Sequence, residues 1–152
     1  MVDELDFNQQ VRNYIYSFTV EHTRPPTVAE AAQELGAPPD RVREAYLFLG
    51  EHHAVFLEPG AAEPRVRMAF PFSAIPTPFR VTVQGKTYFA NCAWDMLGIP
   101  AALHQDAAIE ASCADCGEPL TIHVRSARVI AGDYVAHFLL PFRQWYADLA
   151  DT

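Results

Sequence analysis

The sequence has no long apolar run, and it begins with acidic rather than basic residues. No stretch of about 18 apolar residues, the minimum for a transmembrane helix, occurs among its 152 residues, so we expect no membrane-spanning segment. A signal peptide begins with basic residues and continues with an apolar run, whereas residues 1–6 read MVDELD. We therefore expect a cytoplasmic protein without a membrane partner.

Basic residues and cysteines are also few. Lysine and arginine number 11 against 19 aspartates and glutamates, and the resulting net charge of −8 repels phosphate backbones, so we expect no nucleic-acid partner. The chain has three cysteines, an odd number, and the cytoplasm is reducing. They are therefore expected to be free thiols or metal ligands rather than disulfides.

Hydrophobic residues, in contrast, make up 50% of the chain, which is enough for one domain of ordinary size or two small ones. The first part, 1–69, has the pattern of a winged helix-turn-helix. Thr27 and Glu30 have the spacing of a capping box, and Gly36 can end the helix that they begin. The predicted elements of this part are helices over 5–21, 27–36 and from residue 40 to about residue 52, and wing strands over 54–58 and 65–69.

A winged helix often binds DNA through its third helix. Here Arg41 and Arg43 lie near the start of that helix, but Glu44 and Glu51 follow them, so the helix has no basic face. We prefer the interpretation that residues 1–69 form a packing domain that covers the second half. A regulator that binds DNA and senses metal through its thiols is a further alternative.

The second part, 70–152, is predicted to be a mostly antiparallel sheet with short helices, so the whole chain belongs to the α+β class. It opens with a crossing over 70–78, where three prolines exclude helix and sheet interior. A helix from about Cys92 to Leu103 is expected to be interrupted or to end near Gly98 and Pro100. The other predicted elements are strands over 79–83, 86–90, 108–112, 120–125, 128–130 and 134–140 and a last helix over 142–149.

Cys92 and Asp95 are the first candidate functional pair. Asn91 is a good N-cap, which would place Cys92 in the first helical turn, where unpaired amides and the helix dipole lower the pKa of a thiol. Asp95 follows three residues later and therefore lies on the same helix face. A thiolate beside a carboxyl group can act as nucleophile and proton donor. The alternative is a buried cysteine and an aspartate that merely suits the helix dipole.

Cys113 and Cys116 form a C-x-x-C-G turn, which is common as one half of a zinc knuckle. Together with Cys92 and Asp95 they have a spacing compatible with paired metal half-sites, so these four residues are the candidate ligands of one soft metal ion. Aspartate is an unusual fourth ligand for structural zinc. The alternative is that one of these thiols is buried and inert.

The segment from Tyr88 to Ala101, YFANCAWDMLGIPA, resembles the signature of the alkylmercury lyases, in which an aromatic strand leads into a cysteine, an aspartate three residues later and a proline-containing turn. The resemblance continues through Ser112-Cys113, residues 117–122, His137-Phe138 and Trp145, and includes the winged-helix pattern with Thr77-Pro78. It therefore covers most of the chain.

The resemblance implies a protonolytic cleavage of carbon–mercury bonds that requires no cofactor. Soft thiolates bind the organomercurial cation, a small organometallic ligand, and Cys92 is the implied mercury-binding thiolate. Asp95 is the implied proton relay to the leaving carbon. Cys113 matches a family cysteine regarded as structural.

The chain also departs from the family pattern. The family has a second catalytic cysteine just before its histidine–phenylalanine strand, whereas residues 132–138 read GDYVAHF, with Asp133 or Tyr134 at the matching place. Cys116 stands where the family has no expected cysteine, so it is a candidate for the missing catalytic sulfur. One open alternative is a non-catalytic metal-binding domain of the same fold that holds mercury, zinc or copper at Cys92, Asp95, Cys113 and Cys116. The other is a related enzyme with another substrate.

Overall fold

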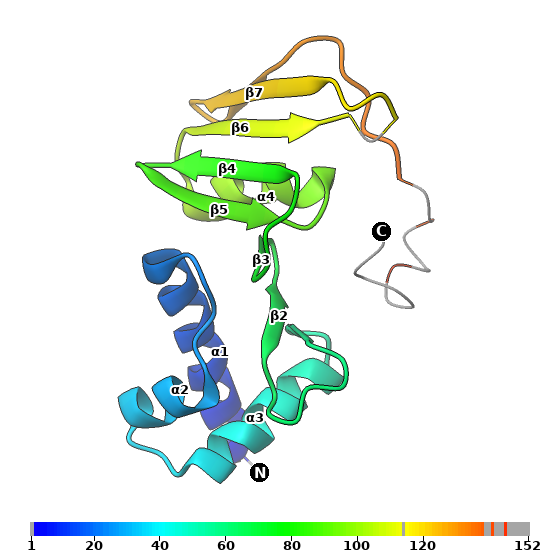
Figure 1. The fold of residues 1–152 in the computed structure, drawn as a ribbon. Helices are drawn as coiled ribbons and strands as arrows, with labels where there is room; N and C mark the ends of the chain where they lie inside the picture. Colours follow the sequence, from blue (N-terminus) through cyan, green and yellow to red (C-terminus); the bar gives the residue numbers. More distant parts are fainter. Residues whose placement is uncertain (1, 114, 139–140, 142–144, 146–152) are drawn as a thin grey trace. The chain divides into compact units, whose positions relative to one another are not determined.

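The computed structural model describes residues 2–113, 115–138, 141 and 145, and it divides the chain into two compact units, Met1–Pro76 and Thr77–Thr152 (Figure 1). The predicted α+β class is confirmed, since three N-terminal helices are followed by antiparallel strands and a fourth helix. Within the described part of the chain, no helix combines the length and apolarity needed to cross a bilayer.

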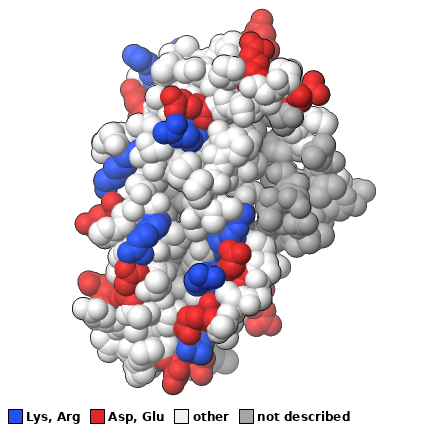
Figure 2. Space-filling model, viewed as in Figure 1, with Lys and Arg blue, Asp and Glu red and all other residues white. Residues whose placement is uncertain are grey.

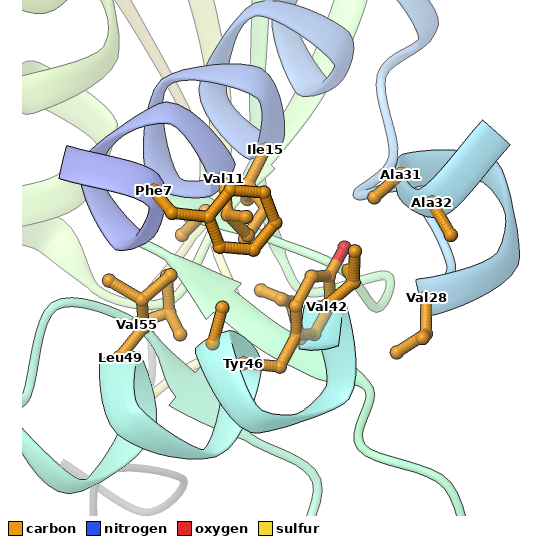
Figure 3. Packing of buried hydrophobic residues seen from close by; sticks show 13 residues of the cluster. Phe7, Val11, Ile15, Val28, Ala31, Ala32, Val42, Tyr46, Leu49 and Val55 are labelled. Carbon is orange, nitrogen blue, oxygen red and sulfur yellow. The ribbon is translucent and has the colours of Figure 1, made fainter. Parts of the chain in front are cut away.

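The first unit has a core between three helices. Its helices are α1 (Val2–His22), α2 (Val28–Leu35) and α3 (Pro39–Glu51), in agreement with the predicted order. Figure 3 shows apolar side chains of α1 facing those of α3, with the small residues of α2 beside them. Tyr46 is fully buried in this core, and its hydroxyl donates a hydrogen bond of 3.1 Å to the carbonyl of Pro26. The tyrosine thereby fixes the loop that precedes α2.

The start of α2 is the capping box that the sequence predicts. The hydroxyl of Thr27 accepts from the amide of Glu30, and the Glu30 carboxylate accepts from the amide of Thr27 at 2.8 Å. Arg24 adds a two-armed ion pair to the same carboxylate, at 2.6 and 3.0 Å. Gly36 ends the helix in the left-handed conformation, at φ 60°.

Three short strands complete the first unit: β1 (Phe56–Leu57), β2 (Val66–Ala69) and β3 (Phe72–Ser73). The antiparallel pairing of β1 with β2 forms the predicted wing. Strand β3 pairs with β2, so the segment 70–78, whose prolines were expected to exclude helix and sheet interior, contributes one two-residue strand. Its two residues lie between Pro71 and Pro76, so both can supply the backbone amides that proline lacks.

The second unit is an antiparallel sheet with one helix. Its strands are β4 (Phe79–Val83), β5 (Lys86–Ala90), β6 (Ala107–Ser112), β7 (Pro119–Arg125) and β8 (Arg128–Ile130) in the order β5-β4-β6-β7-β8. Alternating side chains such as Val81, Ile109 and Ile122 are buried, as expected for a sheet with one covered face. Helix α4 (Ala93–Leu103) contacts β4 and β5 (Figure 1).

Two predictions for this unit are corrected. Helix α4 continues without interruption through Gly98 and Pro100, because the missing proline amide removes only one hydrogen bond near the C-terminal end and the proline ring is buried. The predicted strand over 134–140 is not formed in its described part, 134–138, where most residues are exposed. The remainder of that strand and the predicted helix over 142–149 lie outside the described residues, apart from Trp145.

Candidate active site

The site lies where strand β5 passes into helix α4. Thr77 fixes the end of this strand, because its hydroxyl donates a hydrogen bond to the carbonyl of Ala90. The amide of Phe79, the first residue of β4, donates in turn to the Thr77 hydroxyl at 3.2 Å. The chain then has only Asn91 and Cys92 before the helix begins. The hairpin therefore determines the direction in which α4 starts.

Cys92 is the N-cap of α4, and this corrects the prediction that Asn91 is the N-cap and Cys92 a first-turn residue. Its backbone is extended, with φ −146° and ψ −179°, and the helical residues begin at Ala93. The Cys92 side chain therefore lies at the helix start, beside the backbone amides of Asp95 and Trp94. The cysteine remains next to the positive end of the helix dipole, one position earlier than expected.

Cys92 and Asp95 lie together, as their spacing predicts. The Cys92 thiol donates to the Asp95 carboxylate, with 3.5 Å between Sγ and Oδ2, and the backbone amide of Asn91 also hydrogen-bonds the carboxylate. Asp95 is buried, with 9% of its surface exposed, whereas Cys92 is partly exposed. Cys92 is thus more accessible to a ligand than the carboxyl group beside it.

Burial changes the pKa of both groups. It raises the pKa of Asp95 to about 6, although the hydrogen bonds from the Cys92 thiol and the Asn91 amide oppose this shift. The pKa of the Cys92 thiol is also raised, chiefly by burial and further by the Asp95 charge, which together outweigh the nearby amides. This direction contradicts the sequence-based expectation of a lowered thiol pKa, because that argument considered the helix dipole and omitted desolvation.

Cys113 and Cys116 lie in the turn between β6 and β7, and both are free thiols. Among the residues that the structure describes, no three histidine, cysteine, aspartate or glutamate side chains gather closely enough to hold a metal ion. The expected four-ligand site of Cys92, Asp95, Cys113 and Cys116 is therefore not assembled in this structure. The two candidate pairs are each formed separately.

Comparison with known proteins supports the resemblance seen in the sequence. Residues 72–151 match the sequence profile of the family described as alkylmercury lyase. The chain belongs to the alkylmercury lyase family. The matched range includes both candidate pairs and, of the first unit, only residues 72–76.

Individual members of the alkylmercury lyase family match parts of the chain. The alkylmercury lyase of Bacillus cereus is 39% identical over 57 residues, which are 38% of this chain and 26% of that enzyme. The alkylmercury lyase of Staphylococcus epidermidis is 30% identical over 107 residues, 70% of this chain and 46% of that enzyme. The chain thus spans less than half the length of these relatives.

A solved structure shares the fold. The mercury-bound form of MerB2 superimposes with a TM-score of 0.62 at 22% sequence identity, covering 86% of this chain and 66% of that protein. At this identity the similarity extends to the fold and not to individual residues.

The structure also describes the segment in which the alkylmercury lyase pattern leads one to expect a second catalytic cysteine. Asp133 and Tyr134 are exposed there, and 47% of the tyrosine surface is open. The rings of Phe138 and Trp145, two residues that carry the resemblance, lie 5.3 Å apart between centroids. His137 is also exposed.

Arg41 and Arg43, which lie near the start of α3, both make contacts with other side chains. Arg43 forms an ion pair of 2.8 Å with Glu63, and the guanidinium of Arg41 lies 4.1 Å from the ring centroid of Phe7. Figure 2 shows lysine and arginine side chains interspersed with acidic ones on the face that it presents. Both arginines therefore make contacts within the first unit.

Sequence reasoning missed two groups that hold the site in place. The amide of Asn91 and the hydroxyl of Thr77 both hold the segment that presents Cys92. An acidic residue at the third helical position often reaches back to an amide before the helix, so the spacing of Asp95 was the available signal for the Asn91 contact. No comparable signal in the sequence indicates Thr77, because its partner is 13 residues away.

Proposed function

We propose that the chain is an alkylmercury lyase that cleaves carbon–mercury bonds with Cys92 as the mercury-binding sulfur and Asp95 as the proton relay. Family membership and the 3.5 Å contact between the two side chains support this proposal. The contact carries most of the argument, because it unites a soft metal ligand with a group able to move a proton.

The proton that the reaction needs is already in the site. The pKa of Asp95 is about 6 and that of the Cys92 thiol is raised, so near pH 7 the pair holds one proton, predominantly on sulfur and hydrogen-bonded to the carboxylate. When an organomercurial cation binds Cys92, a sulfur–mercury bond replaces the S–H bond and the proton passes to Asp95. The Asp95 carboxylate oxygen already accepts the hydrogen bond of this thiol.

Cleavage then consumes that proton. The electron pair of the carbon–mercury bond forms the new C–H bond with the proton from Asp95, so the products are a hydrocarbon, a carboxylate and Hg(II) on sulfur. No electrons are gained or lost overall. Mercury changes partners, and Asp95 returns to its ionised form. A shielded carboxyl group suits this step because its raised pKa lets it hold the proton and its burial limits loss of that proton to bulk water.

A second sulfur on mercury weakens the carbon–mercury bond further. We assign this place to a small thiol that accompanies the organomercurial, because the described residues do not group Cys116 with Cys92 and Asp95. Hg(II) then leaves as its thiol complex. This arrangement would explain how the reaction proceeds although residues 132–138 contain no cysteine.

The experiment is hydrocarbon release from phenylmercury acetate. Purified protein with excess 2-mercaptoethanol should produce benzene in proportion to enzyme concentration, as measured by gas chromatography. Cys92→Ala should abolish this production, while Glu34→Gln, a charge change at an exposed position of helix α2, should leave it unchanged. Absence of benzene at every enzyme concentration, or equal production by Cys92→Ala, rules the proposal out.

A further inference from the structure

We propose that Cys113 and Cys116 form a second functional site, a dithiol that binds one soft metal cation separately from the Cys92–Asp95 pair. The chemical class of ligand is a thiophilic ion that accepts two sulfur donors, with Hg(II) as the representative. The site itself does not depend on the proposed lyase activity. The site could bind the mercury that the lyase reaction releases, and only this use of the site rests on the proposed activity.

The turn between β6 and β7 is closed at both ends, which holds the two cysteines close together. The amide of Cys113 donates 2.8 Å to the carbonyl of Glu118, and the amide of Gly117 donates 2.9 Å to the carbonyl of Cys113. Gly117 has φ +73°, a conformation that glycine adopts without the penalty of a side chain. Backbone hydrogen bonds therefore join Cys113 to both Gly117 and Glu118.

The backbone amides of this turn are directed at one of the sulfurs. The amides of Cys116 and Asp115 both hydrogen-bond the sulfur of Cys113, and its side chain also interacts with that of Cys116. Amides that point at sulfur stabilise a thiolate, which is the form that binds metal. Cys113 is partly exposed and Cys116 is exposed, so a cation can reach both sulfurs from solvent.

The number of donors limits which metal fits. Structural zinc takes four ligands, and no third histidine, cysteine, aspartate or glutamate joins this pair among residues 2–113, 115–138, 141 and 145. Soft thiolates prefer soft ions, and Hg(II) and Cu(I) form stable complexes with two sulfurs in a nearly linear arrangement. The turn is therefore suited to such an ion rather than to zinc.

Binding is a simple exchange of protons for metal. Two S–H bonds break, two sulfur–mercury bonds form, and two protons leave to solvent without oxidation or reduction. Because both sulfurs belong to one turn, the second bond forms within the molecule at an effective concentration on the order of millimolar or higher. The pair should thus retain Hg(II) against a monothiol that removes it from a single cysteine.

The test uses the full chain with Cys92→Ser, which leaves Cys113 and Cys116 as its thiols. The reduced protein is loaded anaerobically with mercuric chloride, exposed to increasing 2-mercaptoethanol and desalted, and bound mercury is measured by native mass spectrometry. We expect one mercury per chain. Adding Cys113→Ser or Cys116→Ser should lower the monothiol concentration that removes half of the mercury by about tenfold or more.

A matched control changes the turn without removing a sulfur. Asp115→Asn in the Cys92→Ser background should retain mercury as well as its parent, and circular dichroism verifies that every variant is folded. Equal retention by the single-thiol variants, two mercury ions per chain, or no retention by Cys92→Ser would each overturn the dithiol site. Loss of retention in Asp115→Asn would also overturn it, because a carboxylate would then be a ligand. Benzene release fails or succeeds independently of these results.

Discussion

The thiol of Cys92 donates a hydrogen bond to the carboxylate of Asp95, with 3.5 Å between sulfur and oxygen. This orientation reverses the roles that the sequence suggested, in which a helix-stabilised thiolate lies beside a carboxylic acid. Burial disfavours both the thiolate of Cys92 and the carboxylate of Asp95, so the pair keeps one proton, which lies on the sulfur. Each metallation of the sulfur then releases a proton beside the group proposed to transfer it.

Replacing Asp95 by asparagine should remove activity and increase stability at alkaline pH. Asparagine can accept the same hydrogen bonds but cannot carry the proton, so we expect benzene release to fall at least about a hundredfold. The pKa of Asp95 is raised from 3.8 to about 6 on folding, so its contribution to stability is full below pH 3.8 and is lost as the pH rises through about 6.

At pH 8 the ionised carboxylate therefore opposes folding, and Asp95→Asn should raise the free energy of unfolding by about 1–2 kcal/mol. The gain should shrink toward pH 4. Urea denaturation at both values measures it, with Glu34→Gln as the control of equal charge change. A variant less stable than the parent at pH 8 contradicts the assigned burial cost.

The pH dependence of benzene release should be bell-shaped. Below pH about 6, Asp95 is already protonated and cannot accept the thiol proton, so the rate of the free enzyme should fall on the acid side. Above the raised pKa of Cys92 the proton is lost from the pair and the rate should fall again. The two apparent values belong to the coupled pair rather than to either residue. A rate that increases steadily as the pH falls from 7 to 5 excludes the relay.

The three cysteines should differ in their reactivity toward iodoacetamide. The pKa of Cys113 is lowered by the amides of Cys116 and Asp115, whereas burial raises that of Cys92. At pH 7.5, Cys113 should therefore be alkylated faster than Cys92 by about tenfold or more, since the thiolate is the nucleophile. Peptide mapping by mass spectrometry at timed intervals gives both rates. Faster labelling of Cys92 would contradict the assigned order of pKa values.

The capping box at Thr27 should contribute measurably to the stability of the first unit. Thr27→Ala removes the acceptor for the amide of Glu30 and should lower the free energy of unfolding by about 1 kcal/mol. Ser17→Ala, on the exposed side of α1, is the matched loss of a hydroxyl and should cost no stability. Chemical denaturation of both variants measures the difference, and equal stability would mean that the cap is dispensable.

Local patterns predicted the elements of this fold well where one short-range rule decides the structure. Thr27 with Glu30 marked the beginning of α2, and the strands predicted over 79–83 and 86–90 match β4 and β5. The rules failed where packing competes with a local preference. Pro100 is accommodated inside α4 because its ring is buried, and Cys92 precedes the helix because the strand ends only two residues earlier.

For the site, spacing alone brought Cys92 and Asp95 together, since residues three apart share a helix face. It could not give the direction of the thiol pKa, which depends on how much surrounding protein excludes water. Nor could spacing decide whether the Cys92–Asp95 pair and the Cys113–Cys116 pair lie close together, because the sheet sets the distance between the two pairs. The separate formation of the Cys92 and Cys113 pairs is therefore a result of tertiary structure.

In the sequence, Trp94 lies between Cys92 and Asp95, the two residues of the proposed active site, and 68% of its surface is exposed. An indole in this position fluoresces, and a heavy atom bound nearby shortens the lifetime of its excited state through spin–orbit coupling. Binding of mercury at Cys92 should therefore quench the fluorescence of Trp94, and release of the mercury should restore the fluorescence. The fluorescence of Trp94 therefore reports whether mercury is bound at Cys92, so that binding and release can be timed without a chromogenic substrate.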